Sequence, residues 1–166
     1  MQLRTVQPLR PAGFSLIELM VVVVIGAILL TLAVPSYVSY IRQSRRTEAK
    51  TAVLDLAARE ERFFSTSGAA YSQTPTQLGL TGAGFPVSVG NNYYTVTACS
   101  PATGGAAPCN DTTPPVAPSF QIVAVPVAAN GQNKDLQCQL YGVDSTGKQW
   151  AQDNLGNDNT TYCWAN

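Results

Sequence analysis

The sequence predicts an α+β fold in which a long N-terminal helix packs on a small antiparallel sheet of about four strands. Three features lead to this prediction. An uncharged apolar run extends from Leu19 to Val34, strong helix formers dominate from Thr47 to Arg62, and short alternating segments separated by turn residues follow Tyr93. We expect three structural parts: a membrane-spanning helix over 14–35, an amphipathic helix over 36–67 and a globular head over 68–166.

The composition favours one small domain attached to an anchor. The chain has 166 residues, of which 45% are hydrophobic and 12% are charged. Its ten basic residues balance its ten acidic residues, which does not favour a nucleic acid or another polyanion as partner. The chain has no histidine, which is the commonest general base and metal ligand, and no nucleophile or phosphate-binding motif. We therefore expect neither enzymatic activity nor a cofactor.

The apolar run carries one acidic residue close to its start. The 21 residues Phe14–Val34 would span a hydrocarbon core of ~30 Å as a helix rising about 1.5 Å per residue. Glu18 argues against a cleaved secretory signal, whose core is apolar. A plain single-pass anchor is a second interpretation, but the basic residues Arg42, Arg45 and Arg46 would then hold the C-terminal part in the cytoplasm. The four cysteines argue against that orientation, because disulfides persist outside the cytoplasm.

A third interpretation explains Gly13 and Glu18 together. Residues 13–20 read GFSLIELM, which resembles the leader junction of type IV pilins and related pseudopilins. The resemblance implies that residues 1–13 are a leader peptide, which prepilin peptidase removes by cutting after Gly13, and that Phe14 is then N-methylated. Glu18 follows the cut by five residues, where the family has an acid, and Pro35 occupies the place of a common helix-kinking proline.

For Glu18 the resemblance implies a role in assembly. Its carboxylate would pair with the α-amino group of Phe14 on an adjacent subunit, inside an apolar filament core. An ion pair in such a core is heavily penalised when one partner is missing. Glu18 would therefore set the axial register of a new subunit, although pairing with the amine of its own chain stays open.

The helix beyond Pro35 is predicted from residue spacing. Ser36 would act as a cap at a break in the helix at Pro35, and the helix is expected to end near Ser67, before a glycine. The stripe Val53–Phe64, with its two phenylalanines Phe63 and Phe64, is expected to pack on the sheet. Residues 45–65 also resemble the corresponding part of minor pilins.

Alternating residues predict the strands of the head. A first strand is expected over Tyr93–Ala98, and further strands over residues 119–127, 135–144 and from 148 onward. Pro126 is expected to place the far end of the second strand at an edge or a bulge. Asn130 and Gly131 predict a turn, and Gly147 closes a second turn with a positive φ angle. The stretches 68–92 and 152–166 are expected to be irregular.

The four cysteines predict disulfides rather than a zinc site, because no pair has the close spacing of zinc ligands. Four cysteines allow three pairings. We expect Cys99 to pair with Cys109, which would staple a loop that has no core of its own. We expect Cys138 to pair with Cys163, which would match the disulfide-bounded C-terminal loop of pilins.

The tail contains a cluster of oxygen-bearing side chains that raises the question of calcium. The cluster lacks the spacing and the terminal glutamate of a calcium-binding loop, so we expect a solvated loop and no metal site. Its members are Asp153, Asn154, Asn157, Asp158 and Asn159.

The resemblance implies a structural subunit of a type IV pilus, closest to the minor pilins of the type IVa pilus. Its partners would be other pilin subunits in a helical filament, the prepilin peptidase/N-methyltransferase, the inner-membrane assembly machinery, and the membrane before assembly. The subunit would lie in the bacterial inner membrane with a periplasmic head, then in an extracellular pilus that serves adhesion and twitching motility. A pseudopilin of a type II secretion system and a DNA-uptake pilin are the alternatives. The two lysines and five aspartates of the head do not favour nucleic acid.

Overall fold

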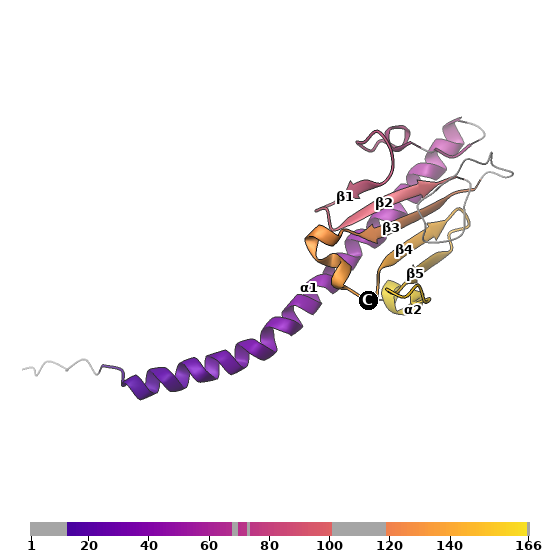
Figure 1. The fold of residues 1–166 in the computed structure, drawn as a ribbon. Helices are drawn as coiled ribbons and strands as arrows, with labels where there is room; N and C mark the ends of the chain where they lie inside the picture. The colour runs from indigo at the N-terminus through magenta and orange to yellow at the C-terminus, as the bar shows by residue number, and fades with distance from the viewer. Residues whose placement is uncertain (1–12, 68–69, 73, 101–118, 166) are drawn as a thin grey trace, which may run out of the picture. The chain divides into compact units, whose positions relative to one another are not determined.

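The computed structural model describes residues 13–67, 70–72, 74–100 and 119–165. The chain divides into two compact units, one ending at Val38 and the other beginning at Ser39. One helix, α1 (Leu16–Ser67), contributes to both units. The strands and the shorter helices belong to the second unit (Figure 1).

Pro35 lies inside α1, and the helix is uninterrupted at that point. The predicted break at Pro35, with Ser36 as a cap, is therefore wrong. A proline inside a helix removes one backbone hydrogen bond and crowds the carbonyl four residues earlier, but the turns on either side of Pro35 continue the helical pattern. A kink at Pro35 stays a prediction. The predicted end of the helix at Ser67 is confirmed.

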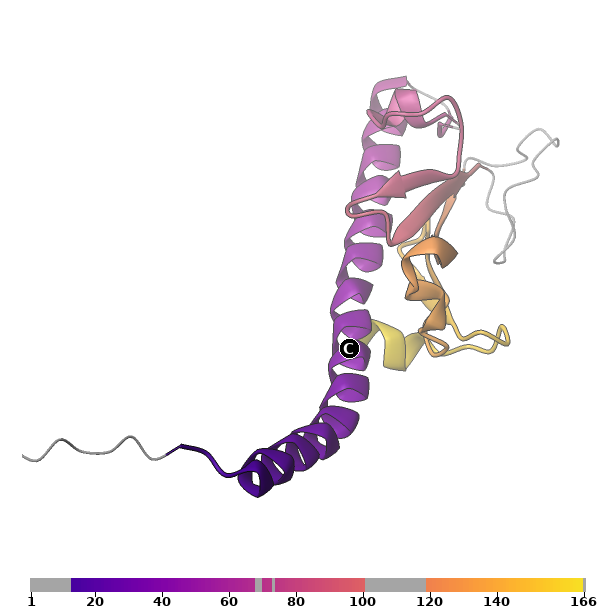
Figure 2. The ribbon, with the colours of Figure 1, turned by 60° about the vertical axis from the view of Figure 1, so that its left-hand side comes forward.

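The second half of α1 buries one stripe of its surface. Ala49, Val53 and Leu56 follow one another at helical spacing, and none is more than 2% exposed. They belong to one hydrophobic core with the inner face of the sheet, which lies along this half of the helix (Figure 2). Phe63 packs partly buried against the same core, which confirms its predicted packing, whereas the half-buried Phe64 stacks on Tyr71 with ring centroids 4.7 Å apart.

The sheet is a five-stranded antiparallel meander in which each strand pairs with its neighbour in the sequence. The predicted antiparallel sheet is confirmed, with one strand more than expected. Its strands are β1 (Val87–Val89), β2 (Tyr94–Cys99), β3 (Gln121–Pro126), β4 (Leu140–Asp144) and β5 (Gln149–Gln152).

The alternation of residues along the strands selects the inner face of the sheet. In β2 the side chains of Tyr94, Val96 and Ala98 are buried, as the alternating pattern predicts. The register aligns Val96 with Ala124, which is paired with Tyr141 on the next strand. This row crosses the centre of the sheet, so the core lies between it and α1.

Two strands differ from their predicted extents. The sequence placed 87–89 in an irregular loop, but these residues form β1, an edge strand that pairs Val87 with Val96 and Val89 with Tyr94. Three residues between a proline and a glycine are too few for a recognisable alternation. Strand β4 begins at Leu140, five residues later than expected, because the chain before it forms the 3₁₀ helices η2 (Ala128–Asn130) and η3 (Gln132–Lys134) and a turn.

Two further comparisons concern Pro126 and the tail. Pro126 ends β3, the central strand, and pairs there with Tyr94 of β2. The pairing of β3 with β4 stops at Ala124, so the far end of β3 is a local edge, as predicted. A terminal proline loses no ladder bond that the strand needs. The tail is not wholly irregular, because it contains α2 (Thr160–Ala165), and a further 3₁₀ helix, η1, spans Pro75–Leu78.

Both predicted turns are confirmed. Gly131 has a φ angle of 69° between η2 and η3, and Gly147 has a φ angle of 80° between β4 and β5. In the second turn the amide of Gly147 donates to the carbonyl of Asp144 at 2.9 Å. A positive φ suits glycine because it has no Cβ.

Candidate functional site

The residues of the predicted leader junction lie at the start of α1. Gly13 and Phe14 precede the helix, and Phe14 is 83% exposed. The first helical hydrogen bond runs from the amide of Leu19 to the carbonyl of Ser15 at 3.1 Å. Glu18 therefore occupies the first turn and is exposed. An acid is favoured there because it interacts with the positive end of the helix dipole.

The first half of α1 presents apolar side chains on all sides. Its large hydrophobic residues from Leu16 to Val34 are between 49% and 77% exposed. Within the described chain, α1 is one helix that is long and apolar enough to cross a membrane. A helix that is hydrophobic all round needs a lipid or protein environment. Glu18 is the one charged side chain in this surface.

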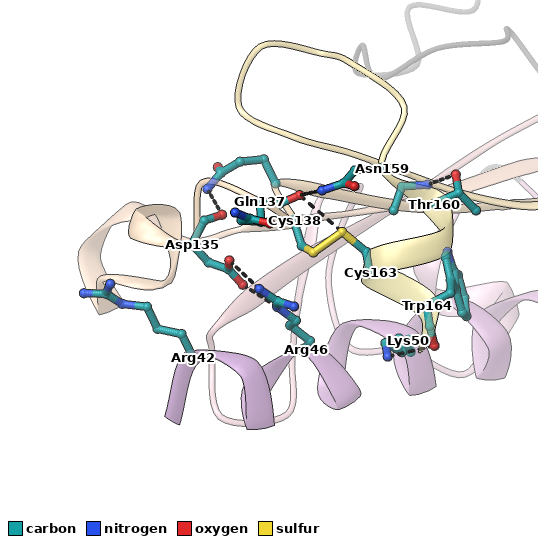
Figure 3. The surroundings of a disulfide bond; sticks show 12 residues. Arg42, Arg46, Lys50, Asp135, Gln137, Cys138, Asn159, Thr160, Cys163 and Trp164 are labelled. Carbon is teal, nitrogen blue, oxygen red and sulfur yellow. Dashed lines mark hydrogen bonds and ion pairs between the residues drawn. A yellow bond between two sulfur atoms is a disulfide. The ribbon is translucent and has the colours of Figure 1, made fainter. Parts of the chain in front are cut away.

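A buried ion pair fastens α1 to the segment that precedes β4. Nε of Arg46 lies 2.7 Å from Oδ2 of Asp135, and Nη2 lies 2.9 Å from Oδ1 (Figure 3). The two side chains are only 6% and 5% exposed. Burial by itself would lower the pKa of Arg46, but the hydrogen bonds and the charge of Asp135 outweigh it, and the pKa is raised above its usual value. Arg46 is therefore a permanent cation with a structural partner.

A disulfide holds the tail against the same region. Cys138 and Cys163 are bonded, with their Cα atoms 5.8 Å apart, so this predicted pairing is confirmed. The bond joins α2 to the chain just before β4 (Figure 3). Nζ of Lys50 donates to the carbonyl of Trp164 at 3.2 Å, which ties α2 to α1 as well. Cys109 lies outside the described residues, so its pairing with Cys99 stays a prediction.

Besides Asp135, the head has another buried carboxyl group, that of Glu60. It lies on the stripe of α1 that contains Ala49, Val53 and Leu56. Glu60 is fully buried, and its Oε2 accepts a hydrogen bond from the amide of Ser72 at 2.9 Å. Its Oε1 is buried without a hydrogen-bond partner in the part of the chain that the structure describes. Burial raises the pKa of Glu60 from 4.5 to about 7, and the bond from Ser72 opposes the rise only in part.

The turn between β1 and β2 packs closely on α1. The amide of Asn91 donates to Oε1 of Glu48, and the guanidinium of Arg45 lies 3.7 Å from the centroid of the Tyr93 ring. A Cβ atom on Gly90 would meet the carboxylate of Glu48 and displace it, and the φ angle of 53° at this position also favours glycine. Arg45 and Glu48 of α1 therefore hold the turn that follows the edge strand β1.

The acidic tail uses its carboxylates within the loop. Oδ1 of Asp153 accepts hydrogen bonds from the amides of Leu155 and Asn157, and Oδ1 of Asp158 accepts one from the amide of Thr160, the first residue of α2. Within the described residues, no group of three or more Asp, Glu, Cys or His side chains is placed to hold a metal ion. The arrangement is that of a self-bonded loop, in which the carboxylates satisfy backbone amides.

Three buried charged residues were not predicted from the sequence. Glu60 follows Leu56 by four positions, so it lies on the predicted stripe Val53–Phe64; Arg46 precedes Ala49 by three and lies on the same helix face, ahead of that stripe. The periodicity was a usable signal for these two residues. Asp135 carried no such signal, because it lies in an irregular segment that was predicted to be a strand.

Two protein-family models match the chain. Residues 9–34 match a model described as the prokaryotic N-terminal methylation motif. Residues 35–142, more than half of the chain, match a model described as the type IV minor pilin ComP, DNA uptake sequence receptor.

A known type IV pilin is also similar to this chain in sequence. The type IV major pilin protein PilA of Myxococcus xanthus (strain DK1622) is 37% identical over 92 residues. The alignment covers 55% of this chain and 39% of PilA, so this chain spans less than half of that relative's length.

Proposed function

This chain belongs to the type IV pilin family, and we propose that it is a structural subunit of a type IV pilus and acts there as a minor subunit. The apolar first half of α1, with Glu18 as its single charge, supports this proposal most directly. Such a surface is compatible with lipid before assembly and with a bundle of identical helices afterwards. The filament would serve adhesion and twitching motility.

The proposed pathway begins in the membrane. The chain inserts through α1 with its head on the periplasmic side, and prepilin peptidase removes residues 1–13 by cutting after Gly13. Phe14 becomes the new N-terminus and is methylated, and its amine stays cationic. The exposure of Gly13 and Phe14, ahead of the first turn of α1, supports access by such an enzyme.

Glu18 would then direct assembly. In lipid its carboxylate costs up to roughly 2.5–3.5 kcal/mol at the bilayer centre, and less near the interface. In the filament core the cationic amine of Phe14 on a neighbouring subunit would neutralise it. A subunit placed out of register leaves both charges buried and unpaired, which costs about 3–5 kcal/mol. Glu18 thus favours one axial position over the others.

Two variants and one control test this proposal. Gly13→Ala should leave an uncut precursor that is absent from filaments, while Glu18→Ala should be cut and inserted into the membrane but assembled poorly. Asp55→Ala is the matched control, since it removes an acid from the same helix and breaks only an exposed pair with Arg59. Sheared filaments would be quantified against membrane fractions. Normal assembly of both the Gly13 and the Glu18 variants would refute the proposal.

A DNA-uptake role is a second candidate, favoured by one observation. The family model that covers 35–142 is described as a DNA uptake sequence receptor. The head itself carries two lysines against five aspartates, which is weak support for binding a polyanion. A gel shift of duplex DNA with the full chain in detergent distinguishes the candidates. Salt-sensitive retardation of the DNA would favour uptake, and its absence would leave the structural role alone. A pseudopilin of a type II secretion system stays a further alternative.

A further inference from the structure

A small cavity opens where the start of the second unit meets the segment before β4. Its volume is about 270 Å³. Its walls come from α1, from the end of η3 and the turn that follows it, and from α2. The residues used below are Arg42, Arg46, Lys134, Asp135, Leu136 and Tyr162.

The cavity has an excess of positive charge. Asp135 is already occupied by the bidentate pair with Arg46. In the described part of the chain, the Arg42 guanidinium and the Lys134 ammonium have no ion-pair partner. Figure 3 shows Arg42 extending away from the Arg46–Asp135 pair. Two uncompensated cations at one cavity favour an anionic ligand.

Arg46 adds a directed donor. Its Nη1 atom is buried and has no geometric hydrogen-bond partner among the described residues, while the guanidinium lies 5.1 Å from the centroid of the Tyr162 ring, which helps to raise the pKa of Arg46. A buried donor without an acceptor costs free energy, and a ligand oxygen could supply that acceptor. The cavity therefore offers a third, preorganised contact besides Arg42 and Lys134.

Apolar surface borders the same cavity. Leu136 is 57% exposed, and Tyr162 is 41% exposed. Tyrosine is enriched where proteins meet the membrane interface, because its ring is apolar and its hydroxyl is polar. Cations next to such residues are suited to the headgroup layer of a membrane, where the lipid phosphates lie.

The position of the cavity in the chain indicates that its anionic ligand comes from the membrane. The cavity begins at Ser39, four residues beyond Pro35, where the apolar segment ends. Even a fully extended chain covers no more than roughly 14 Å in four residues. The headgroup region adds several ångströms beyond the hydrocarbon core on each side. In a membrane-inserted subunit the cavity is thus held near the lipid headgroups.

We propose that this cavity binds the headgroup phosphate of an anionic phospholipid while the subunit waits in the membrane. Arg42 and Lys134 pair with the phosphate, Nη1 of Arg46 donates a hydrogen bond to it, and Leu136 and Tyr162 contact the interface. The site positions the head before assembly and releases the lipid on extraction. This inference rests on the proposed membrane stage of the chain.

The test uses the full chain in a nonionic detergent, titrated with dioleoyl phosphatidylglycerol or dioleoyl phosphatidylcholine and followed by native mass spectrometry. The wild-type chain should prefer the anionic lipid. Each basic residue near an anionic surface changes affinity about fivefold, so Arg42→Gln with Lys134→Gln should lose roughly 25-fold. Arg62→Gln with Lys148→Gln is the matched control, because it removes the same charges from exposed positions outside the cavity.

Two results would overturn the site alone: equal binding of the two lipids, or unchanged binding by the Arg42/Lys134 variant. Displacement of the lipid by excess inorganic phosphate would assign the cavity to a free anion, and preferential binding of duplex DNA there would assign it to nucleic acid. Both outcomes contradict the lipid proposal. Integration into vesicles of each lipid is measured in parallel. Failure to integrate into either vesicle would remove the membrane stage itself, and this inference with it.

Discussion

The buried carboxyl group of Glu60 should make the folded head less stable as the pH rises. Glu60 is fully buried, and only its Oε2 has a described hydrogen-bond partner, the amide of Ser72. Burial raises its pKa from 4.5 to about 7. Between about pH 4.5 and 7 the folded chain therefore holds a proton that the unfolded chain has largely released.

The sign and size of the effect follow from this difference. The stabilisation that protonated Glu60 gives the folded state is fully present below about pH 4.5 and is lost as the pH rises to about 7. Above that pH, Glu60 causes no further change in the free energy of unfolding. At about 1.4 kcal/mol per pKa unit, the shift corresponds to about 3 kcal/mol in the free energy of unfolding. The chain has no histidine, so few other side chains titrate in this range.

The assay is urea unfolding of the full chain in detergent micelles between pH 4.5 and 8, followed by tryptophan fluorescence. Glu60→Gln should abolish most of the fall, although its amide nitrogen, buried without a partner, lowers stability by about 1–3 kcal/mol at every pH. Asp55→Asn, at an exposed position of the same helix that is paired only with Arg59, should keep the wild-type slope. Identical pH profiles for the wild type and Glu60→Gln would refute the reasoning.

Three further changes test the packing of the head by the same unfolding assay. Asp135→Ala leaves a buried arginine unpaired and should cost about 3–5 kcal/mol; a loss below 1 kcal/mol would show that the pair is dispensable. Cys138→Ser with Cys163→Ser opens a disulfide with a separation of 25 residues and should cost about 3 kcal/mol, with unchanged stability as the contrary result. Gly142→Ala places a Cβ 2.1 Å from the Trp150 ring and should cost about 1–3 kcal/mol, whereas a neutral effect would mean that the ring moves freely.

The predictable parts of the fold were those with regular periodicity. Tyr94, Val96 and Ala98 alternate with polar residues, so the inner face of β2 followed from the sequence. The turn that ends at Gly147 followed from its turn residues. Strand β1 and helix α2 did not, because each is short and depends on tertiary contacts, with β2 for one and with the disulfide for the other.

The candidate site also has residues whose roles could be predicted from the sequence and contacts that could not. Gly13, Phe14 and Glu18 form a contiguous motif, so their predicted roles needed only the sequence, and these roles stay predictions. The pair between Arg46 and Asp135 joins residues 89 positions apart, and no local pattern could reveal it. Long-range polar contacts depend on how the segments pack, which residue periodicity does not encode.

The most direct test of the account is the N-terminal mass of this chain in sheared surface filaments. The account predicts a subunit that begins with N-methylated Phe14 and lacks residues 1–13. Filaments that contain the chain with its leader, or filaments from which the chain is absent while it accumulates in processed form at the membrane, would contradict the claim that it is processed and assembled as a pilin.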